Sequence, residues 1–235
     1  MKNIAILAVV VLAVSTSLAS DRAPGAGSAE RRKGAATPKE AVAKFADAIR
    51  AMDKNAMIAC CSGSKTEMRI VEIMADFGQA VLEFKKKFIK AYGEQAWKDF
   101  QDPNKKLDAG NARFMLPSGA DLEAAKKQKI TMEKDGTATF EQVGSTQQGK
   151  LVKVNGSWFV DAKSLLPPNA RPEDFIKMMT AFTALVGKYQ KAIGHDGVSG
   201  EDIDVELGRA MVKLLLGFRT DQPHRFDIDK IASGK

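Results

Sequence analysis

Hydrophobic residues recur every three or four positions in the first part of the chain, which is the spacing of an amphipathic helix. One such face follows Thr37-Pro38-Lys39-Glu40, a capping box with proline at the first helical position. We expect Thr37 to bond the amide of Glu40, and Glu40 to reach back to the start of the helix. A short second helix is predicted over residues 55–61, and a long one from Lys65 to Tyr92, ended by Gly93.

The hydrophobic period changes to two in the middle of the chain, which indicates strands. Alternation over residues 130–142 surrounds Asp135-Gly136, and a second alternating pair surrounds Asn155-Gly156, which suits a type I′ hairpin turn. Helical spacing returns over residues 175–189 and again from Ser199. We therefore predict an α+β fold in which N-terminal helices pack on a curved, cone-like antiparallel sheet of at least four strands, followed by C-terminal helices.

The amino terminus has the pattern of a secretory signal peptide. Lys2 precedes the apolar run Ile4–Val14, and Ser17-Leu18-Ala19 provides a small-x-small cleavage step. The run is shorter than the roughly 17–25 residues of a membrane span. We expect cleavage near Ala19, no integral membrane span afterwards, and export to the periplasm or out of the cell; an uncleaved anchor is the alternative.

These patterns divide the chain into four parts. We expect a signal peptide at residues 1–19, a flexible Gly-, Ala- and charge-rich leader at 20–36, an α+β domain at 37–168 and a helical extension at 169–235. Two stretches lack a period: residues 101–119, which we interpret as a loop, and the last 17 residues, which we expect to be irregular.

Composition limits the kinds of metal, disulfide and catalytic site that the chain can form. The 235 residues include only 2 Cys and 2 His, which excludes zinc clusters, disulfide frameworks and multi-histidine metal sites within one chain. No catalytic residue, metal ligand or cofactor is therefore predicted. The adjacent Cys60 and Cys61 leave three alternatives open: a strained ring, pairing between chains, or reduced and buried thiols.

The charge is positive without indicating a nucleic-acid partner. The chain carries 36 Lys and Arg against 29 acids, a net +7, and cleavage near Ala19 leaves 35 against 29, or +6. Lys85, Lys86, Lys87 and Lys90 fan around a helix with no stacking aromatics among them, which favours a solvated face over a nucleic-acid site. Gly63-Ser64-Lys65-Thr66 lacks the further glycine and the preceding strand of a phosphate-binding loop.

Aromatic and methionine side chains are the candidates for lining a pocket, with an ordinary hydrophobic core as the alternative. The helical stripe over residues 175–189 is unusually broad and includes Met178 and Met179, so it needs cover from a neighbouring helix, a second copy of the chain or an acyl chain. The ligand-binding candidates are Phe88, Tyr92, Met132, Phe140, Trp158 and Phe182.

The stretch Ala36–Cys61, with a capped first helix followed by a second, and the hairpins ITMEKDGTATFEQV and GKLVKVNGSWFVDAKSLLP resemble secreted members of the nuclear transport factor 2-like superfamily. The resemblance covers roughly residues 36–167 and implies helices on a curved sheet. Enzymes of this superfamily use a tyrosine and acids that project into the cone, whereas Tyr92 and Tyr189 lie on predicted helices. A looser likeness, in architecture alone, is to periplasmic phospholipid carriers.

The expected function is that of an exported, non-enzymatic binding protein. Its cone pocket or helical extension would take a small apolar ligand or a protein partner, which includes a second copy of the chain. One alternative is a periplasmic carrier of lipids or other hydrophobic molecules. A second alternative is an enzyme, which would need convergent polar groups with perturbed pKa values in a deep pocket.

Overall fold

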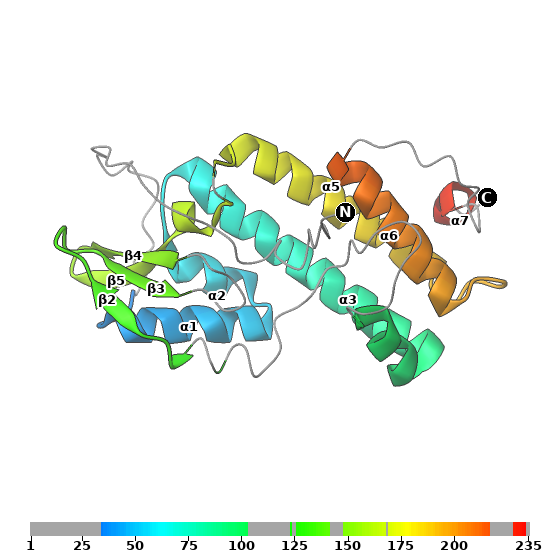
Figure 1. Cartoon of the computed structure of the whole chain (residues 1–235), viewed down its shortest axis with the longest axis horizontal. Helices are drawn as coiled ribbons and strands as arrows, with labels where there is room; N and C mark the ends of the chain where they lie inside the picture. The colour runs from blue at the N-terminus through cyan, green and yellow to red at the C-terminus, as the bar shows by residue number, and fades with distance from the viewer. Residues whose placement is uncertain are drawn as a thin grey trace, which may run out of the picture. The chain divides into compact units, whose positions relative to one another are not determined.

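A computed structural model describes residues 34–102, 123, 126–141, 148–167, 169–216 and 228–233. It has the predicted α+β class, with helices and a five-stranded sheet (Figure 1). The signal peptide, the leader up to residue 33 and most of the loop expected over 101–119 lie outside the described residues. The elements are α1 Pro38–Ala51, α2 Lys54–Ala59, β1 Cys61–Ser62, α3 Lys65–Gln101, β2 Ile130–Met132, β3 Ala138–Glu141, β4 Gln148–Val154, β5 Ser157–Asp161, the 3₁₀ turn η1 Ala162–Leu165, α5 Pro172–Ala192, α6 Gly200–Leu216 and α7 Ile228–Ser233.

The helix starts follow the capping signals. The Thr37 hydroxyl accepts the N–H of Glu40 at 3.2 Å, as predicted, and α1 begins at Pro38. The Glu40 carboxylate accepts the N–H of Ala36 at 2.9 Å, so it reaches one residue further back than a capping box requires. The helix predicted over residues 55–61 is one residue out of place at its start and ends at Ala59, because Cys61 joins the sheet.

The sheet has the strand order β1-β5-β4-β3-β2, and both predicted hairpins are present. Asn155 and Gly156, with φ angles of 49° and 84°, form the turn between β4 and β5. Strands β2 to β5 are antiparallel, as expected, but β1 pairs with β5 in parallel, which makes the sheet mixed. A two-residue strand has no periodicity to detect, so the sequence contained no signal for β1.

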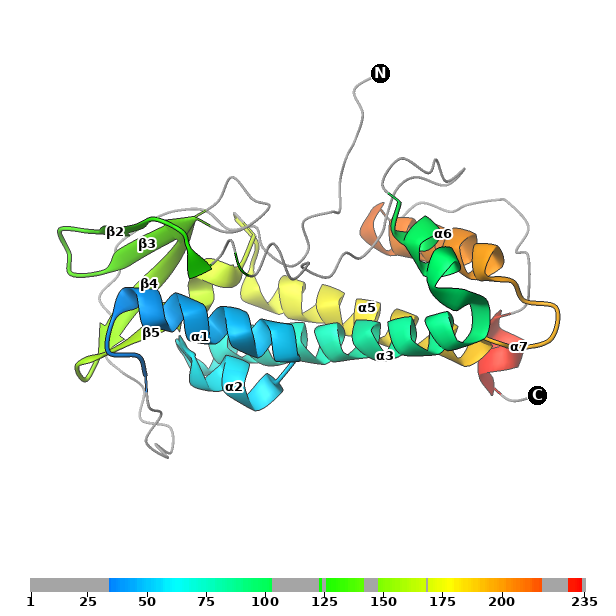
Figure 2. The same cartoon turned by 90° about the horizontal axis from the view of Figure 1, so that it is seen from below.

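One face of the sheet is apolar across all five strands. The register places Met132, Ala138, Leu151, Val160 and Cys61 in one row, and the last four are fully buried. Met132 on the terminal strand β2 is 57% exposed. Helix α1 packs against β5 (Figure 2) and contributes Val42, Phe45 and Ile49 to the buried core.

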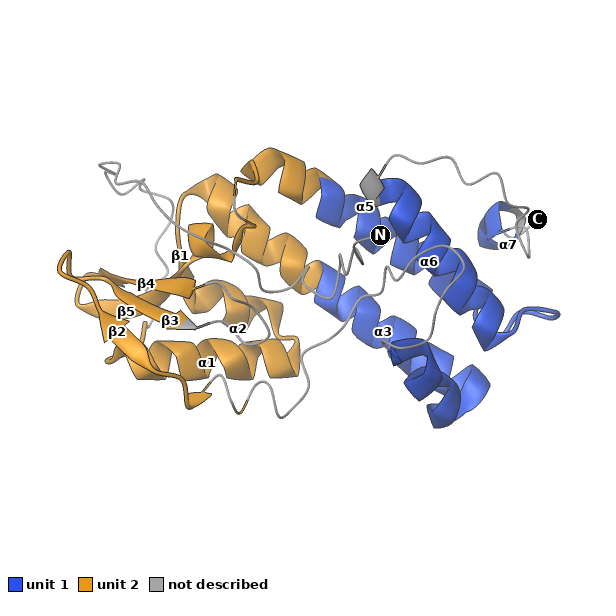
Figure 3. Ribbon diagram, in the orientation of Figure 1, with its two compact units in different colours: residues 1–8, 77–115, 178–235 blue, residues 9–76, 116–177 orange. Residues whose placement is uncertain are grey.

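The chain forms two compact units, each assembled from separate stretches of sequence (Figure 3). Unit 1 comprises residues 1–8, 77–115 and 178–235, and unit 2 comprises residues 9–76 and 116–177. Unit 2 therefore holds the sheet with α1 and α2, and unit 1 holds α6 and α7. Helices α3 and α5 each contribute residues to both units. The domain boundary expected at residue 168 stays a prediction.

The helices of unit 1 confirm the break at Gly93 and correct the expectation for the carboxyl terminus. Gly93 has φ 91° and ψ 164°, so α3 consists of two helical segments that meet at this residue. The last 17 residues are not irregular throughout, because α7 forms over Ile228–Ser233 and buries Ile228. Within the described ranges, no helix is long and apolar enough to cross a membrane.

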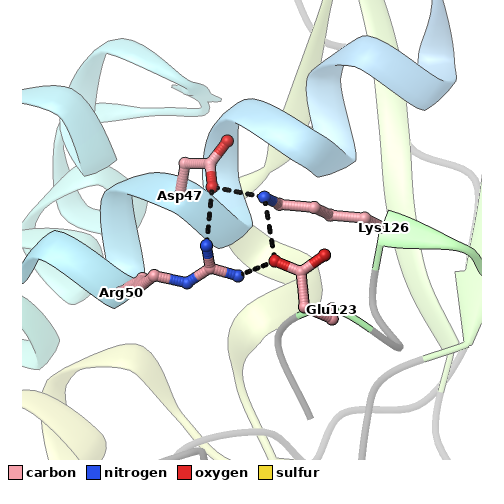
Figure 4. A network of polar contacts seen from close by, with 4 residues as sticks. All are labelled: Asp47, Arg50, Glu123 and Lys126. Carbon is pink, nitrogen blue, oxygen red and sulfur yellow. Dashed lines mark hydrogen bonds and ion pairs between the residues drawn. The ribbon is translucent and has the colours of Figure 1, made fainter. Parts of the chain in front are cut away.

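Four charged side chains connect α1 of unit 2 to residues 123 and 126 (Figure 4). Lys126 Nζ lies 2.6 Å from Asp47 and 3.4 Å from Glu123, and Arg50 contacts both acids. Arg50 first, and then Lys126, lower the pKa of Glu123. Because the acids and Arg50 are solvent-exposed, water screens these pairs, and each stabilises the fold only weakly.

Candidate functional site

The six predicted ligand-binding residues fall into two groups of three. Phe88, Tyr92 and Phe182 belong to the helices of unit 1, whereas Met132, Phe140 and Trp158 belong to the sheet of unit 2. Phe88 and Phe182 are each 1% exposed, and Tyr92 is half-buried.

The three residues of unit 2 lie on the apolar face of the sheet. Met132 is opposite Ala138, which shares its face with Phe140, and Trp158 is opposite Lys153 on the same face. Phe140 covers Gly149, where any Cβ would clash with the ring. Lys153 Nζ lies 5.8 Å from the Trp158 ring centroid. Phe140 and Trp158 are buried, so Met132 alone of these three is exposed to solvent.

Unit 1 contains an aromatic cluster centred on Phe88. Its ring centroid lies 5.8 Å from Phe84, 5.0 Å from Tyr92, 5.7 Å from Trp97 and 5.3 Å from Phe100. We call these five residues the aromatic cluster. Phe182 pairs with Phe77 at 6.3 Å. The structure thus joins two predicted residues, Phe88 and Tyr92, to three that were not among the candidates.

The sequence explains how the aromatic cluster forms. Phe84, Phe88 and Tyr92 follow one another at intervals of four residues, which places them on one helix face. Gly93 adopts a backbone conformation that is essentially restricted to glycine, and this brings Trp97 and Phe100 back onto that face. The signal missed in the sequence was the pair of aromatic residues three apart just after a helix-ending glycine.

Tyr92 anchors the connection between α5 and α6 to the aromatic cluster. Its hydroxyl accepts the N–H of Gly194 at 2.9 Å and donates to the carbonyl of Val198 at 2.9 Å. A Cβ on Gly200, at the start of α6, would lie 3.1 Å from the Phe88 ring and 3.3 Å from the Tyr92 ring. A residue without a side chain therefore allows α6 to begin directly against these rings.

Trp97 of the aromatic cluster carries a buried hydrogen-bond donor, and Lys85 places a positive charge beside it. Trp97 is 3% exposed, and its indole N–H has no hydrogen-bond partner among the residues that the structure describes. The ammonium group of half-buried Lys85 lies 5.7 Å from the centroid of the same ring. Within the described part of the chain, no acidic side chain forms an ion pair with Lys85. The aromatic cluster therefore combines buried rings with one indole N–H that an acceptor oxygen would satisfy, and a lysine charge lies over the face of the same ring.

Two acidic side chains come together in unit 2, where β5 ends and α3 begins. Asp161 accepts the N–H of Lys163 at 3.1 Å, and buried Glu67 accepts the N–H of Ser64 at 2.7 Å. Burial raises the pKa of Asp161; the Lys163 amide opposes this rise, and the negative charge of Glu67 adds to it. A carboxyl group with a raised pKa is the type of group that acid–base catalysis uses.

The two cysteines are unfavourably placed for nucleophilic chemistry. Cys61 is fully buried in the apolar row of the sheet, and Cys60 is half-buried at the end of α2. Burial raises the pKa of the Cys60 thiol, which the positive charge of Lys44 offsets only in part. The thiolate, which is the reactive form, is therefore disfavoured at Cys60.

Comparison of the chain with protein-family models, curated proteins and solved structures finds no match. The residues that the structure describes contain no group of three or more His, Cys, Asp or Glu side chains arranged to hold a metal ion.

Proposed function

We propose that this chain is an exported, non-enzymatic binding protein whose aromatic cluster takes a small apolar ligand. Export is supported by the signal-peptide pattern of residues 1–19. The nuclear transport factor 2-like resemblance, with its curved sheet, supports a binding scaffold in unit 2. The ligand would pack against the rings of the cluster in unit 1, and the rings must separate to admit it, because Phe84, Phe88, Trp97 and Phe100 are at most 3% exposed.

The indole N–H of Trp97 is the observation that carries the proposal. Leaving a buried donor without an acceptor costs about 1–3 kcal/mol. A buried water is poorly suited to accept this N–H, because such a water needs two to four polar partners. Trp97 instead contacts the rings of Phe84, Phe88 and Phe100. A ligand with an apolar body and one acceptor oxygen would pack against the rings and accept a hydrogen bond from the indole N–H.

Native mass spectrometry of the purified chain, prepared without detergent and incubated with dodecan-1-ol or dodecanoate, tests this proposal. We expect a one-to-one complex that saturates. Trp97→Phe keeps a ring but removes the N–H, and we expect it to weaken binding roughly 3- to 10-fold, the value of one hydrogen bond. Trp158→Phe, the matched change in unit 2, should leave binding unchanged. Absence of any complex with either compound contradicts the proposal.

The lipid-carrier alternative predicts a different result in the same experiment. A carrier prepared without detergent would retain a two-chain lipid from the expression host, seen as a bound mass of several hundred daltons. The enzyme alternative rests on Asp161 and its raised pKa. It predicts a turnover that Asp161→Asn abolishes, whereas binding at the aromatic cluster would be insensitive to this change.

A further inference from the structure

We propose that strand β2 pairs with β2 of a second copy of this chain, antiparallel and in a register centred on Thr131. The strand lies at the end of the sheet order, and Met132 on it is 57% exposed. The surface belongs wholly to unit 2. The inference is therefore independent of ligand binding at the aromatic cluster.

The outer edge of β2 presents the backbone groups of Ile130 and Met132. The N–H of Glu133 donates to the carbonyl of Thr137 at 2.9 Å, so the backbone of Glu133 faces β3. Backbone groups of successive residues in an antiparallel strand face its two edges in turn, so those of Ile130 and Met132 face away from β3. Within the described part of the chain, no strand pairs with this edge. Such an edge is a template for a further strand.

The proposed register matches the apolar residues of the two copies. With Thr131 on the two-fold axis, Ile130 of each copy lies directly opposite Met132 of the other. Because both residues present their backbone groups at the outer edge, each pair can exchange two hydrogen bonds. Ile130 and Met132 lie on the same face of the sheet as Ala138. The apolar face would thus continue from one copy to the next and cover exposed Met132.

The charges that flank β2 are complementary in the same register. Lys129 lies two residues before Thr131, and Glu133 lies two residues after it. Lys129 of each copy therefore lies opposite Glu133 of the other, on the face that bears Thr131. The Glu133 carboxylate accepts the hydroxyl of Thr139 at 3.0 Å, which holds it on this face. Opposite charges directly across a strand pair are favourable, and like charges are unfavourable.

Neighbouring registers lose the apolar match. If the copies slide by two residues in one direction, Met132 lies opposite Gln128. If they slide by two residues in the other direction, Ile130 lies opposite Lys134. A slide of a single residue turns one copy's apolar side chains to the opposite face. The hydrophobic pattern therefore specifies one register.

Sedimentation velocity of the purified chain at low salt tests the association. One short strand pair is smaller than a standard interface, so we expect a reversible dimer with a Kd on the order of 100 µM. The weight-average sedimentation coefficient should rise as the concentration increases from about 5 to about 500 µM, and high salt should reduce this rise by screening the exposed charges. A chain that stays monomeric over this range overturns the proposal.

Charge reversal then tests the register. Lys129→Glu places a like charge opposite Glu133, and Glu133→Lys does the same opposite Lys129, so each variant alone should self-associate about 10-fold more weakly. An equimolar mixture of the two variants should associate again, because every flanking charge then meets its opposite. Lys134→Glu, opposite Gln128 in this register, is the control and should behave as the wild type.

The mixture separates loss of the interface from loss of folding, since a misfolded variant could not restore association. Single variants that associate as the wild type does, or a mixture that remains monomeric, overturn the register centred on Thr131. Equal weakening by Lys134→Glu would show a general effect of net charge and would also overturn it.

Discussion

At the scale of single residues, the raised pKa of Asp161 makes a prediction about stability. The folded chain holds the Asp161 proton more tightly than the unfolded chain does, so the ionised carboxylate destabilises the fold at pH 7. This destabilisation is relieved as the pH falls through the raised pKa. Asp161→Asn removes the charge and keeps an oxygen that accepts the Lys163 amide. We expect a higher Tm than wild type at pH 7, a gain that shrinks as the pH falls through the raised pKa, and no gain from this charge below about pH 3.8, the ordinary value.

The measurement is thermal unfolding of both proteins from pH 3 to pH 8. Glu67, Lys150 and Lys163 are the charged groups that act on Asp161. If the two lysines outweighed burial and Glu67, the asparagine variant would instead be less stable at pH 7, which contradicts the assignment.

Tyr92 gives a second prediction at this scale. Tyr92→Phe keeps the ring beside Phe88 and removes the hydroxyl that joins Gly194 to Val198. We expect a loss of about 1–2 kcal/mol in the free energy of unfolding, the value of two hydrogen bonds that water partly replaces. Urea unfolding measures this loss, and faster hydrogen exchange at the Gly194 amide locates it. Unchanged stability and exchange would show that the hydroxyl does not hold the α5–α6 connection.

At the scale of elements, the break in α3 depends on Gly93. Its φ of 91° and ψ of 164° fall in a region that is nearly restricted to glycine, and a Cβ there would meet no atom within 4 Å. Gly93→Ala should therefore cost about 1–3 kcal/mol through backbone strain alone. Gly187→Ala is the control, since Gly187 lies inside α5 and its Cβ also meets nothing within 4 Å.

Chemical denaturation of the two glycine variants separates strain from side-chain contact. Alanine at Gly187 should stabilise the chain by about 0.5–1 kcal/mol through helix propensity. If alanine stabilised the chain at both positions, or destabilised it at both, backbone strain at Gly93 would be contradicted. The fluorescence of Trp97 reports on its contacts with the neighbouring rings. A change in this fluorescence in the Gly93 variant would show that the break in α3 at Gly93 is needed to form the aromatic cluster.

Local signals predicted the elements well, whereas long-range contacts stayed hidden. Thr37 predicted a helix start and Asn155-Gly156 predicted a hairpin, because helix capping and turn formation depend on residues within four positions of each other. The parallel strand β1 and the short helix α7 are too brief for a hydrophobic period. Phe88 and Tyr92 were identified as candidates, but Lys85 and Trp97 were not, because their relation depends on the chain reversal at Gly93.

At the scale of the whole molecule, the two units have different roles in the proposal. Unit 2 contains the sheet and the sequence motifs on which the proposed binding scaffold rests, while unit 1 contains the aromatic cluster. The sequence order does not show this division, because α3 and α5 each pass through both units. Charge alone was equally uninformative, since a net +7 does not distinguish half-buried Lys85 from the exposed lysines beside it.

The indole proton resonance of Trp97 tests the binding proposal most directly. The chain has two tryptophans, so a ¹H–¹⁵N spectrum shows two indole signals, and Trp97→Phe assigns them. On addition of dodecanoate, we predict a saturable downfield shift of the Trp97 signal, as expected for a new hydrogen bond, with the Trp158 signal unchanged. A Trp97 signal that does not respond to dodecanoate, or that moves no more than the Trp158 signal, contradicts ligand binding at the aromatic cluster.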